Sequence, residues 1–166
     1  MPDYENRSLI ALLACLALAM GCGADADEPA VDFTVFSQAM RAISVRTCRK
    51  AHLCRDSYPY DLVHPFAAAF GDTPQECEDE HTISDERLAL LETSLAAGRI
   101  RYDPGLAADC HAALWAAECR TFWQEAGGAA CADMVRGTLE PGVACRDDWE
   151  CLSESCSRAE GKCQIE

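Results

Sequence analysis

Cysteine is the residue with which this chain can do the most chemistry, since twelve of its 166 residues are cysteines. A cysteine thiolate can bind zinc, act as a nucleophile or enter a disulfide. Cys48, His52 and Cys54 come closest to a zinc pattern, because Cys48 and His52 share one face of a helix. Structural zinc sites use two close ligand pairs, and no second pair follows here. The spacing therefore favours disulfides over a metal centre, and no Cys-x-x-Cys redox motif is present.

The remaining residue types that catalyse reactions form no recognisable motif. No histidine falls in a His-Glu-x-x-His string, and no serine falls in a Gly-x-Ser-x-Gly string. We therefore expect no enzymatic activity and no cofactor other than covalent lipid. The histidines are His52, His64, His81 and His111.

Two further groups of side chains could bind a ligand. Six carboxylates lie between Glu76 and Glu86, but they lack the ligand spacing and the glycine turn of an EF-hand loop. We predict a solvated acidic surface there rather than a calcium site. Trp115, Phe122 and Trp123 could form a binding patch, although aromatic residues at helical spacing more often belong to a core, which we favour.

A run of twelve apolar residues, Leu9–Met20, follows the polar start of the chain. A membrane-spanning helix needs about 20 such residues, so this run has the length of a secretory signal instead. Small residues then precede a cysteine in the string LAMGCG, residues 18–23. This string resembles the bacterial lipobox, in which a peptidase cuts before the cysteine and the thiol accepts a diacylglycerol. We predict a signal peptide over residues 1–21 and lipidation at Cys22, the alternative being an ordinary signal with an incidental Cys22.

The predicted lipid places the protein in the cell envelope. Two or three acyl chains on Cys22, a diacylglycerol and an N-linked acyl group, hold a protein stably on a membrane. Residues 22–32 are small and acidic, and such a composition favours a disordered tether. In the sorting rule for such lipoproteins, Asp after the lipidated cysteine retains the protein in the inner membrane. Gly23 stands at that position, which favours the outer membrane, on its periplasmic face or at the cell surface.

The remaining cysteines fit an oxidising compartment. Cys15 would leave with the signal peptide and Cys22 would carry lipid, so an even number remains. An even number is what a complete set of disulfides requires, and five are predicted. Their cysteines are Cys48, Cys54, Cys77, Cys110, Cys119, Cys131, Cys145, Cys151, Cys156 and Cys163.

The elements that must position these cysteines are mainly helices. Apolar residues recur at steps of three and four between Phe33 and Cys54, and again from Leu88 to Leu95. Ser84 and Asp103 are expected N-caps, the latter followed by proline at the first helical position. A short last helix is expected over Ala130–Arg136. The sequence thus predicts a mostly α, disulfide-stapled domain of four or five short helices over residues 33–139.

Helix geometry limits the disulfide pairing. Cys110 and Cys119 would lie roughly 13–14 Å apart along one helix, and a disulfide tolerates at most about 7 Å between Cα atoms. Cys48 and Cys54 are excluded in the same way, so each helix must send its two cysteines to different partners. Our prediction for the helical part is Cys54–Cys77, Cys119–Cys131 and Cys48–Cys110.

Residues 140–166 differ in kind, because four cysteines crowd into nineteen residues. So short a segment cannot form a hydrophobic core and depends on disulfides. Of three connectivities we favour the interleaved one, Cys145–Cys156 with Cys151–Cys163. The pattern from Gly142 to Cys163 resembles the short repeat of the Dickkopf N-terminal cysteine-rich type, which implies no receptor here because only part of that family's cysteine set is present. The whole layout is similar to cysteine-rich lipoproteins common in myxobacteria, a resemblance that implies no particular activity.

The charge of the chain restricts its partners. The formal net charge is −14, whereas nucleic-acid binding needs basic side chains that displace counterions. We therefore expect no nucleic acid as partner. The sequence predicts an exported, lipid-anchored protein that binds a protein or another envelope ligand. The alternatives are an envelope enzyme, or an enzyme inhibitor in which the cysteine-rich knot of residues 140–166 presents a rigid loop.

Overall fold

The computed structural model describes residues 30–59, 64–125 and 128–165. Its contacts group Val31–Glu166 into one compact unit, so the predicted helical part and the predicted knot belong to the same body. The predicted signal peptide, Cys22 and nearly all of the tether over 22–32 lie outside the described residues. None of the helices in the described part of the chain has both the length and the apolar character needed to cross a bilayer.

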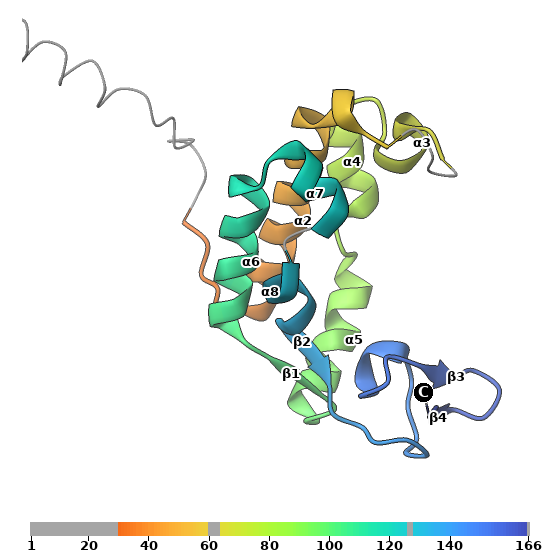
Figure 1. The fold of residues 1–166 in the computed structure, drawn as a ribbon. Helices are drawn as coiled ribbons and strands as arrows, with labels where there is room; N and C mark the ends of the chain where they lie inside the picture. Colours follow the sequence, from red (N-terminus) through yellow and green to blue (C-terminus); the bar gives the residue numbers. More distant parts are fainter. Residues whose placement is uncertain (1–29, 60–63, 126–127, 166) are drawn as a thin grey trace, which may run out of the picture. The chain divides into compact units, whose positions relative to one another are not determined.

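The predicted mostly helical, disulfide-stapled fold is confirmed (Figure 1). The described residues form seven α-helices rather than four or five, because helices of five to eight residues have too few apolar positions to show a periodic pattern. The helices are α2 Phe36–Leu53, α3 Phe66–Phe70, α4 Pro74–His81, α5 Asp85–Ala96, α6 Pro104–Ala116, α7 Cys119–Glu125 and α8 Gly128–Asp133.

The predicted helix starts are confirmed at two places. The Ser84 hydroxyl accepts a hydrogen bond from the Arg87 N–H at 3.3 Å, and α5 begins at the next residue. The Asp103 carboxylate accepts from the N–H groups of Gly105 and Leu106, ahead of α6. Side-chain oxygens at these positions satisfy backbone donors that have no partner within the helix.

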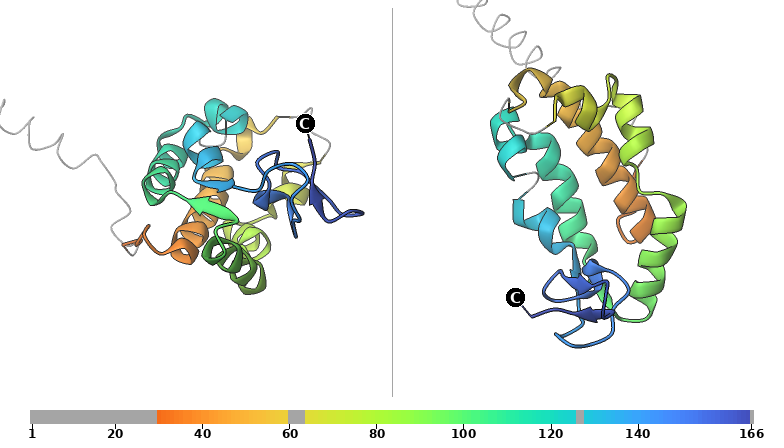
Figure 2. Two further views of the ribbon diagram at one scale, coloured as in Figure 1. Left: turned by 90° about the horizontal axis from the view of Figure 1, so that it is seen from below. Right: turned by 90° about the vertical axis from the view of Figure 1, so that its right-hand side faces the viewer.

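The core lies between α2 and α6, which run side by side (Figure 2). Ala39, Ala51 and Ala107 are fully buried there, so the two helix backbones can approach closely. Phe122 and Leu114 add the larger buried side chains. A second, smaller cluster around Leu88, Leu91 and Ile100 lies beneath α5. The contact between α2 and α6 is thus built around small residues, and larger side chains fill the core on either side of it.

The helix predicted over Ala130–Arg136 is wrong in its second half. Residues Val135–Gly137 form a strand, β2, which pairs antiparallel with β1, Ile100–Tyr102. Each strand has three residues, too few for an alternating pattern to be visible in the sequence. This ribbon leads the chain from the helices into the knot.

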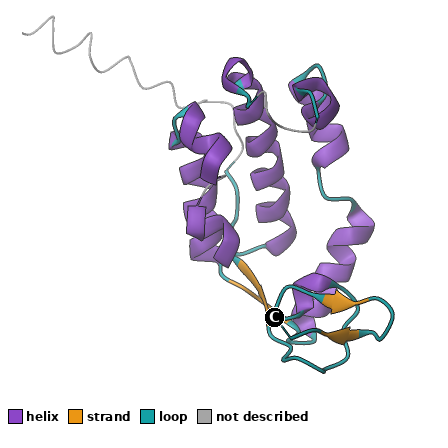
Figure 3. Ribbon diagram, turned by 45° about the vertical axis from the view of Figure 1, so that its right-hand side comes forward, coloured by secondary structure: helices purple, strands orange, loops and turns teal. Residues whose placement is uncertain are grey.

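The knot contains a 3-10 turn, η2 Asp148–Glu150, and a second antiparallel pair, β3 Cys156–Ser157 with β4 Lys162–Cys163 (Figure 3). The predicted interleaved disulfides are confirmed as Cys145–Cys156 and Cys151–Cys163. Cys151 and Cys163 are buried, so sulfur takes the place of a hydrocarbon core.

The three disulfides predicted in the helical part are wrong. Instead of Cys54–Cys77, Cys119–Cys131 and Cys48–Cys110, the structure contains Cys48–Cys77, Cys54–Cys119 and Cys110–Cys131. The reason is how the helices pack: α4 lies along α2 and α8 along α6. Neither Cys48–Cys54 nor Cys110–Cys119 is formed, as predicted, but the single helix assumed for Cys110 and Cys119 is wrong, because α6 ends at Ala116 and α7 begins at Cys119.

Gly137 is the point of closest approach between the ribbon and the knot. A Cβ atom added there would lie 2.6 Å from the Glu150 carbonyl carbon and closer still to the Cys151 carbonyl, both of which are backbone. We expect Gly137→Ala to lower the free energy of unfolding by about 1–3 kcal/mol through overpacking, as measured by chemical denaturation.

Gly105→Ala is the matched control for this substitution. Gly105 lies in the first turn of α6, and an added Cβ would meet only one side-chain oxygen, Asp103 Oδ1 at 3.2 Å. Alanine is the better helix former, but Asp103 Oδ1 must shift by a few tenths of an ångström, so this variant should lose much less stability than Gly137→Ala. Equal losses for both variants would contradict the close approach at Gly137.

Candidate functional site

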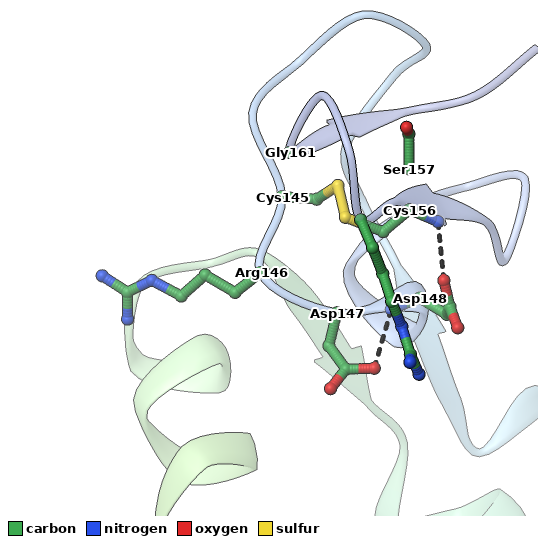
Figure 4. A pocket seen from close by; sticks show the side chains of 8 residues that line it. Cys145, Arg146, Asp147, Asp148, Cys156, Ser157 and Gly161 are labelled. Carbon is green, nitrogen blue, oxygen red and sulfur yellow. Dashed lines mark hydrogen bonds between the residues drawn. A yellow bond between two sulfur atoms is a disulfide. The ribbon is translucent and has the colours of Figure 1, made fainter.

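A groove of about 370 Å³ opens on the knot (Figure 4). The Cys145–Cys156 disulfide lies in it, so the segments on both sides of the groove are covalently fixed to each other. Its lining combines charged, hydroxyl and backbone groups from two stretches of the knot: Cys145, Arg146, Asp147, Asp148, Cys156, Ser157, Arg158 and Gly161.

The two carboxylates of the groove already accept hydrogen bonds from the protein. Asp148 Oδ1 accepts from the Cys156 N–H at 2.7 Å, and Asp147 Oδ1 accepts from the Asp148 N–H at 2.9 Å. Asp147 Oδ2 also lies 3.5 Å from a nitrogen of Arg87. The acidic groups are thus used to hold the knot together.

The hydrogen-bond donors of the groove are more available to a ligand than its two carboxylates are. The Arg146 side chain extends away from the disulfide (Figure 4), and the side chain of Arg158 is exposed. Within the described residues no ion pair engages either guanidinium group. With the Ser157 hydroxyl, these groups offer hydrogen bonds to a ligand that carries a carboxylate or another anionic group.

A buried ion pair fixes the knot to the helical part. Glu150 is 0% exposed, and its two oxygens accept from Arg99 Nε and Nη2, each at 2.8 Å. The Ser94 hydroxyl on α5 donates at 2.7 Å and the Arg146 N–H at 2.8 Å. Arg99 also donates to the Ala144 carbonyl at 2.7 Å. The carboxylate therefore links α5, the ribbon and the groove.

The electrostatics of Glu150 follow from these contacts. Burial acts to raise its pKa, but hydrogen bonds from Arg99, from the Arg146 N–H and from Ser94, with the charge of Arg99, outweigh burial and lower the pKa to about 2. The same pairing raises the pKa of Arg99. Glu150 is therefore charged at every pH at which the protein would normally work.

Sequence reasoning missed Glu150, Arg99 and Ser94. Arg99 and Glu150 are 51 residues apart, and neither belongs to a motif. The only local signal is the position of Glu150, directly before Cys151, which is itself fully buried. This position does not by itself predict burial, because Lys162, directly before the buried Cys163, is exposed.

The residues that suggested zinc have other roles. Cys48 and Cys54 are both in disulfides, so they cannot supply thiolates. His52 Nε2 lies 3.0 Å from the Phe70 carbonyl oxygen. His81 Nε2 lies 2.6 Å from the Ala69 carbonyl oxygen, and the ring of His111 packs 5.2 Å from that of Phe33. None of these histidines lines the groove.

The sulfur atoms of Cys145, Cys151 and Cys163 lie within 4.8 Å of one another. Among the described His, Cys, Asp and Glu side chains, no other group of three or more places its ligand atoms close enough together to hold a metal ion. All three are disulfide-bonded, whereas metal ligation requires thiolates. The stretch Glu76–Glu86 forms no such group, and two of its carboxylates pair with arginines of α2, Glu78 with Arg49 and Asp85 with Arg41.

The three aromatic residues have separate positions. Phe122 is buried in the main core and Trp123 packs against it, as predicted. The prediction of core is wrong for Trp115, which is 36% exposed. The indole of Trp115 lies beneath Arg46 and Lys50, with the Arg46 guanidinium carbon 5.2 Å from the ring centroid, so cation–π contacts hold the ring at the surface.

Comparison with known proteins adds no assignment: no family model, curated protein sequence or solved structure matches this chain.

Proposed function

We propose that this protein is an exported, lipid-anchored binding module of the bacterial cell envelope. The observation that carries the proposal is the pairing of every cysteine in the described residues into five disulfides. Such a set persists in oxidising compartments outside the cytosol. Cys15 and Cys22 are the two cysteines outside it, and both fall in the segment that resembles a lipoprotein signal.

The groove on the knot is the binding surface that we propose. Two disulfides and the Glu150 ion pair hold its walls, so little conformational entropy would be lost when a ligand binds. Its available donors, from Arg146, Arg158 and Ser157, suit a partner with an exposed anionic group. A tether over residues 22–32 would span at most about 35–40 Å when extended, which keeps the module close to the membrane surface.

The anchor is tested by intact mass spectrometry of the full chain extracted from membranes. We expect the mass of a chain that begins at Cys22, increased by a diacylglycerol and an N-acyl group and decreased by ten hydrogens for five disulfides. Cys22→Ala should abolish this processing and the incorporation of labelled palmitate, because no thiol follows the cut.

Cys15→Ala is the matched control, since it removes a cysteine from the apolar run without touching the predicted acceptor. It should be processed and labelled like the parent chain. Labelling of Cys22→Ala, or ten free thiols in the extracted protein, would contradict the proposal.

A further inference from the structure

The five disulfides differ in how well the protein covers them. In four of them at least one cysteine is buried to 1% exposure or less, namely Cys48 and Cys77, Cys54, Cys110 and Cys151, although the partners Cys119 and Cys131 are half-buried. In Cys145–Cys156 neither partner is covered to that degree, because Cys145 is 9% exposed and Cys156 only half-buried. This disulfide is also the one in the groove, with its sulfur–sulfur bond between the two walls (Figure 4).

We propose that Cys145–Cys156 is a site of reversible thiol–disulfide exchange with an external dithiol, and that the other four disulfides are inert under the same conditions. This inference goes beyond the proposed binding function and does not depend on the lipid anchor. Exchange requires a thiolate to approach a sulfur atom along the sulfur–sulfur axis, so access decides which bond reacts. A groove of about 370 Å³ admits a small dithiol to Cys145–Cys156. Cys163 lines another groove, of about 450 Å³, but is only 3% exposed and its partner Cys151 is fully buried, so that bond should react only after local unfolding. Cys119 and Cys131 are half-buried but line neither groove, and their partners Cys54 and Cys110 are buried.

The exchange proceeds in two balanced steps. A thiolate of the dithiol attacks Cys156 Sγ, the more accessible partner, and the bonding electron pair leaves with Cys145 Sγ, which takes up a proton. The second thiol of the reagent then attacks the reagent's own sulfur in the mixed disulfide and releases Cys156, which is protonated in turn. Two electrons and two protons pass from the dithiol to the protein, and the dithiol becomes a disulfide.

Opening this bond leaves the rest of the knot connected. The reagent breaks neither Cys151–Cys163 nor the contacts of Glu150 with Arg99 and Ser94, none of which involves Cys145 or Cys156. The Cys145 N–H still donates to the Gly161 carbonyl at 2.9 Å, and the Cys156 N–H to Asp148. Reduction therefore removes the covalent link between the two walls and leaves hydrogen bonds to hold them, without detaching the knot, so the exchange would loosen the binding surface itself.

The test is timed reduction of the native full chain with dithiothreitol, quenched with iodoacetamide and followed by tryptic peptide mapping. Trypsin separates the reporters, because residues 137–146 contain only Cys145 and residues 163–166 contain only Cys163. We expect Cys145 to be alkylated at least about tenfold faster than Cys163 and the cysteines of the helices, the factor that an opening free energy of 1.4 kcal/mol imposes.

The control is the same reaction in guanidinium chloride, where the five disulfides should react at similar rates. The double variant Cys145→Ser, Cys156→Ser should lose the fast phase and keep the slow ones. If this double variant does not fold, the order of alkylation in the peptide map of the parent protein still tests the proposal. Alkylation of Cys163, Cys119 or Cys131 before Cys145, or of all cysteines together, would overturn the proposal.

Discussion

Glu150→Ala is expected to lower the free energy of unfolding by about 3 kcal/mol, the lower end of the loss for a buried ion pair, because the Arg99 side chain is 27% exposed. The substitution leaves the Arg99 guanidinium facing a cavity: Nε loses its acceptor, and Nη2 keeps only its bond to the Ala144 carbonyl. It also removes the acceptor of the Ser94 hydroxyl and of the Arg146 N–H. Equilibrium denaturation of the disulfide-intact protein measures the loss.

Glu150→Gln separates charge from shape in this site. Glutamine has nearly the same volume and can still accept from Ser94, but it carries no charge to pair with Arg99. We expect it to be less stable than the parent protein and more stable than Glu150→Ala. If both variants lose less than about 1 kcal/mol, the ion pair does not attach the knot to the helices.

The pH dependence of stability provides a second measurement. The pKa of Glu150 is about 2 in the folded protein, below its ordinary value of 4.5. A lowered folded-state pKa gives stability that is complete above the unfolded pKa and is lost as the pH falls towards the folded pKa. The parent protein should therefore lose stability between about pH 5 and pH 2, and Glu150→Gln should lack this part of the slope.

The sequence predicted local features of the fold well, because their causes are local. The N-caps at Ser84 and Asp103 depend on a side chain and a backbone N–H two or three residues away. The knot pairing was predictable because so few residues separate its four cysteines. In each case the residues that interact are close in the chain, so their spacing in the sequence is enough to predict which of them are in contact.

Features that depend on how helices pack were not predictable in the same way. The exclusion of Cys110–Cys119 was argued from one continuous helix, whereas α6 ends at Ala116 and Cys119 begins α7, and the choice of Cys131 for Cys110 depends on α8 lying along α6. The pairing of Glu150 with Arg99 crosses 51 residues, and no periodic pattern joins the two. The candidate groove is a local feature by contrast, because its two lining stretches are joined by the Cys145–Cys156 disulfide that the spacing predicted.

The Cys54–Cys119 disulfide should have the largest effect on stability among the cross-links, because it closes the longest loop. Its cysteines are 65 residues apart in the chain, against 11 for Cys145–Cys156. In the chain-entropy model a loop of that length contributes about 4 kcal/mol, and the shorter loop about 3 kcal/mol. We expect the double variant Cys54→Ala, Cys119→Ala to lose about 4 kcal/mol in the free energy of unfolding.

The matched comparison is the double variant Cys145→Ala, Cys156→Ala, which removes the same number of sulfur atoms from the knot. Packing adds to the difference between the two, because Cys54 is buried at the end of α2 beside Trp123, whose indole N–H donates to the Cys54 carbonyl at 3.1 Å. Loss of the cross-link frees α7 from α2 and exposes this contact to solvent, whereas loss of Cys145–Cys156 frees only a surface segment. Denaturation midpoints of the two variants under identical conditions decide the order, and a greater loss for the knot variant would show that strain or residual structure outweighs loop length.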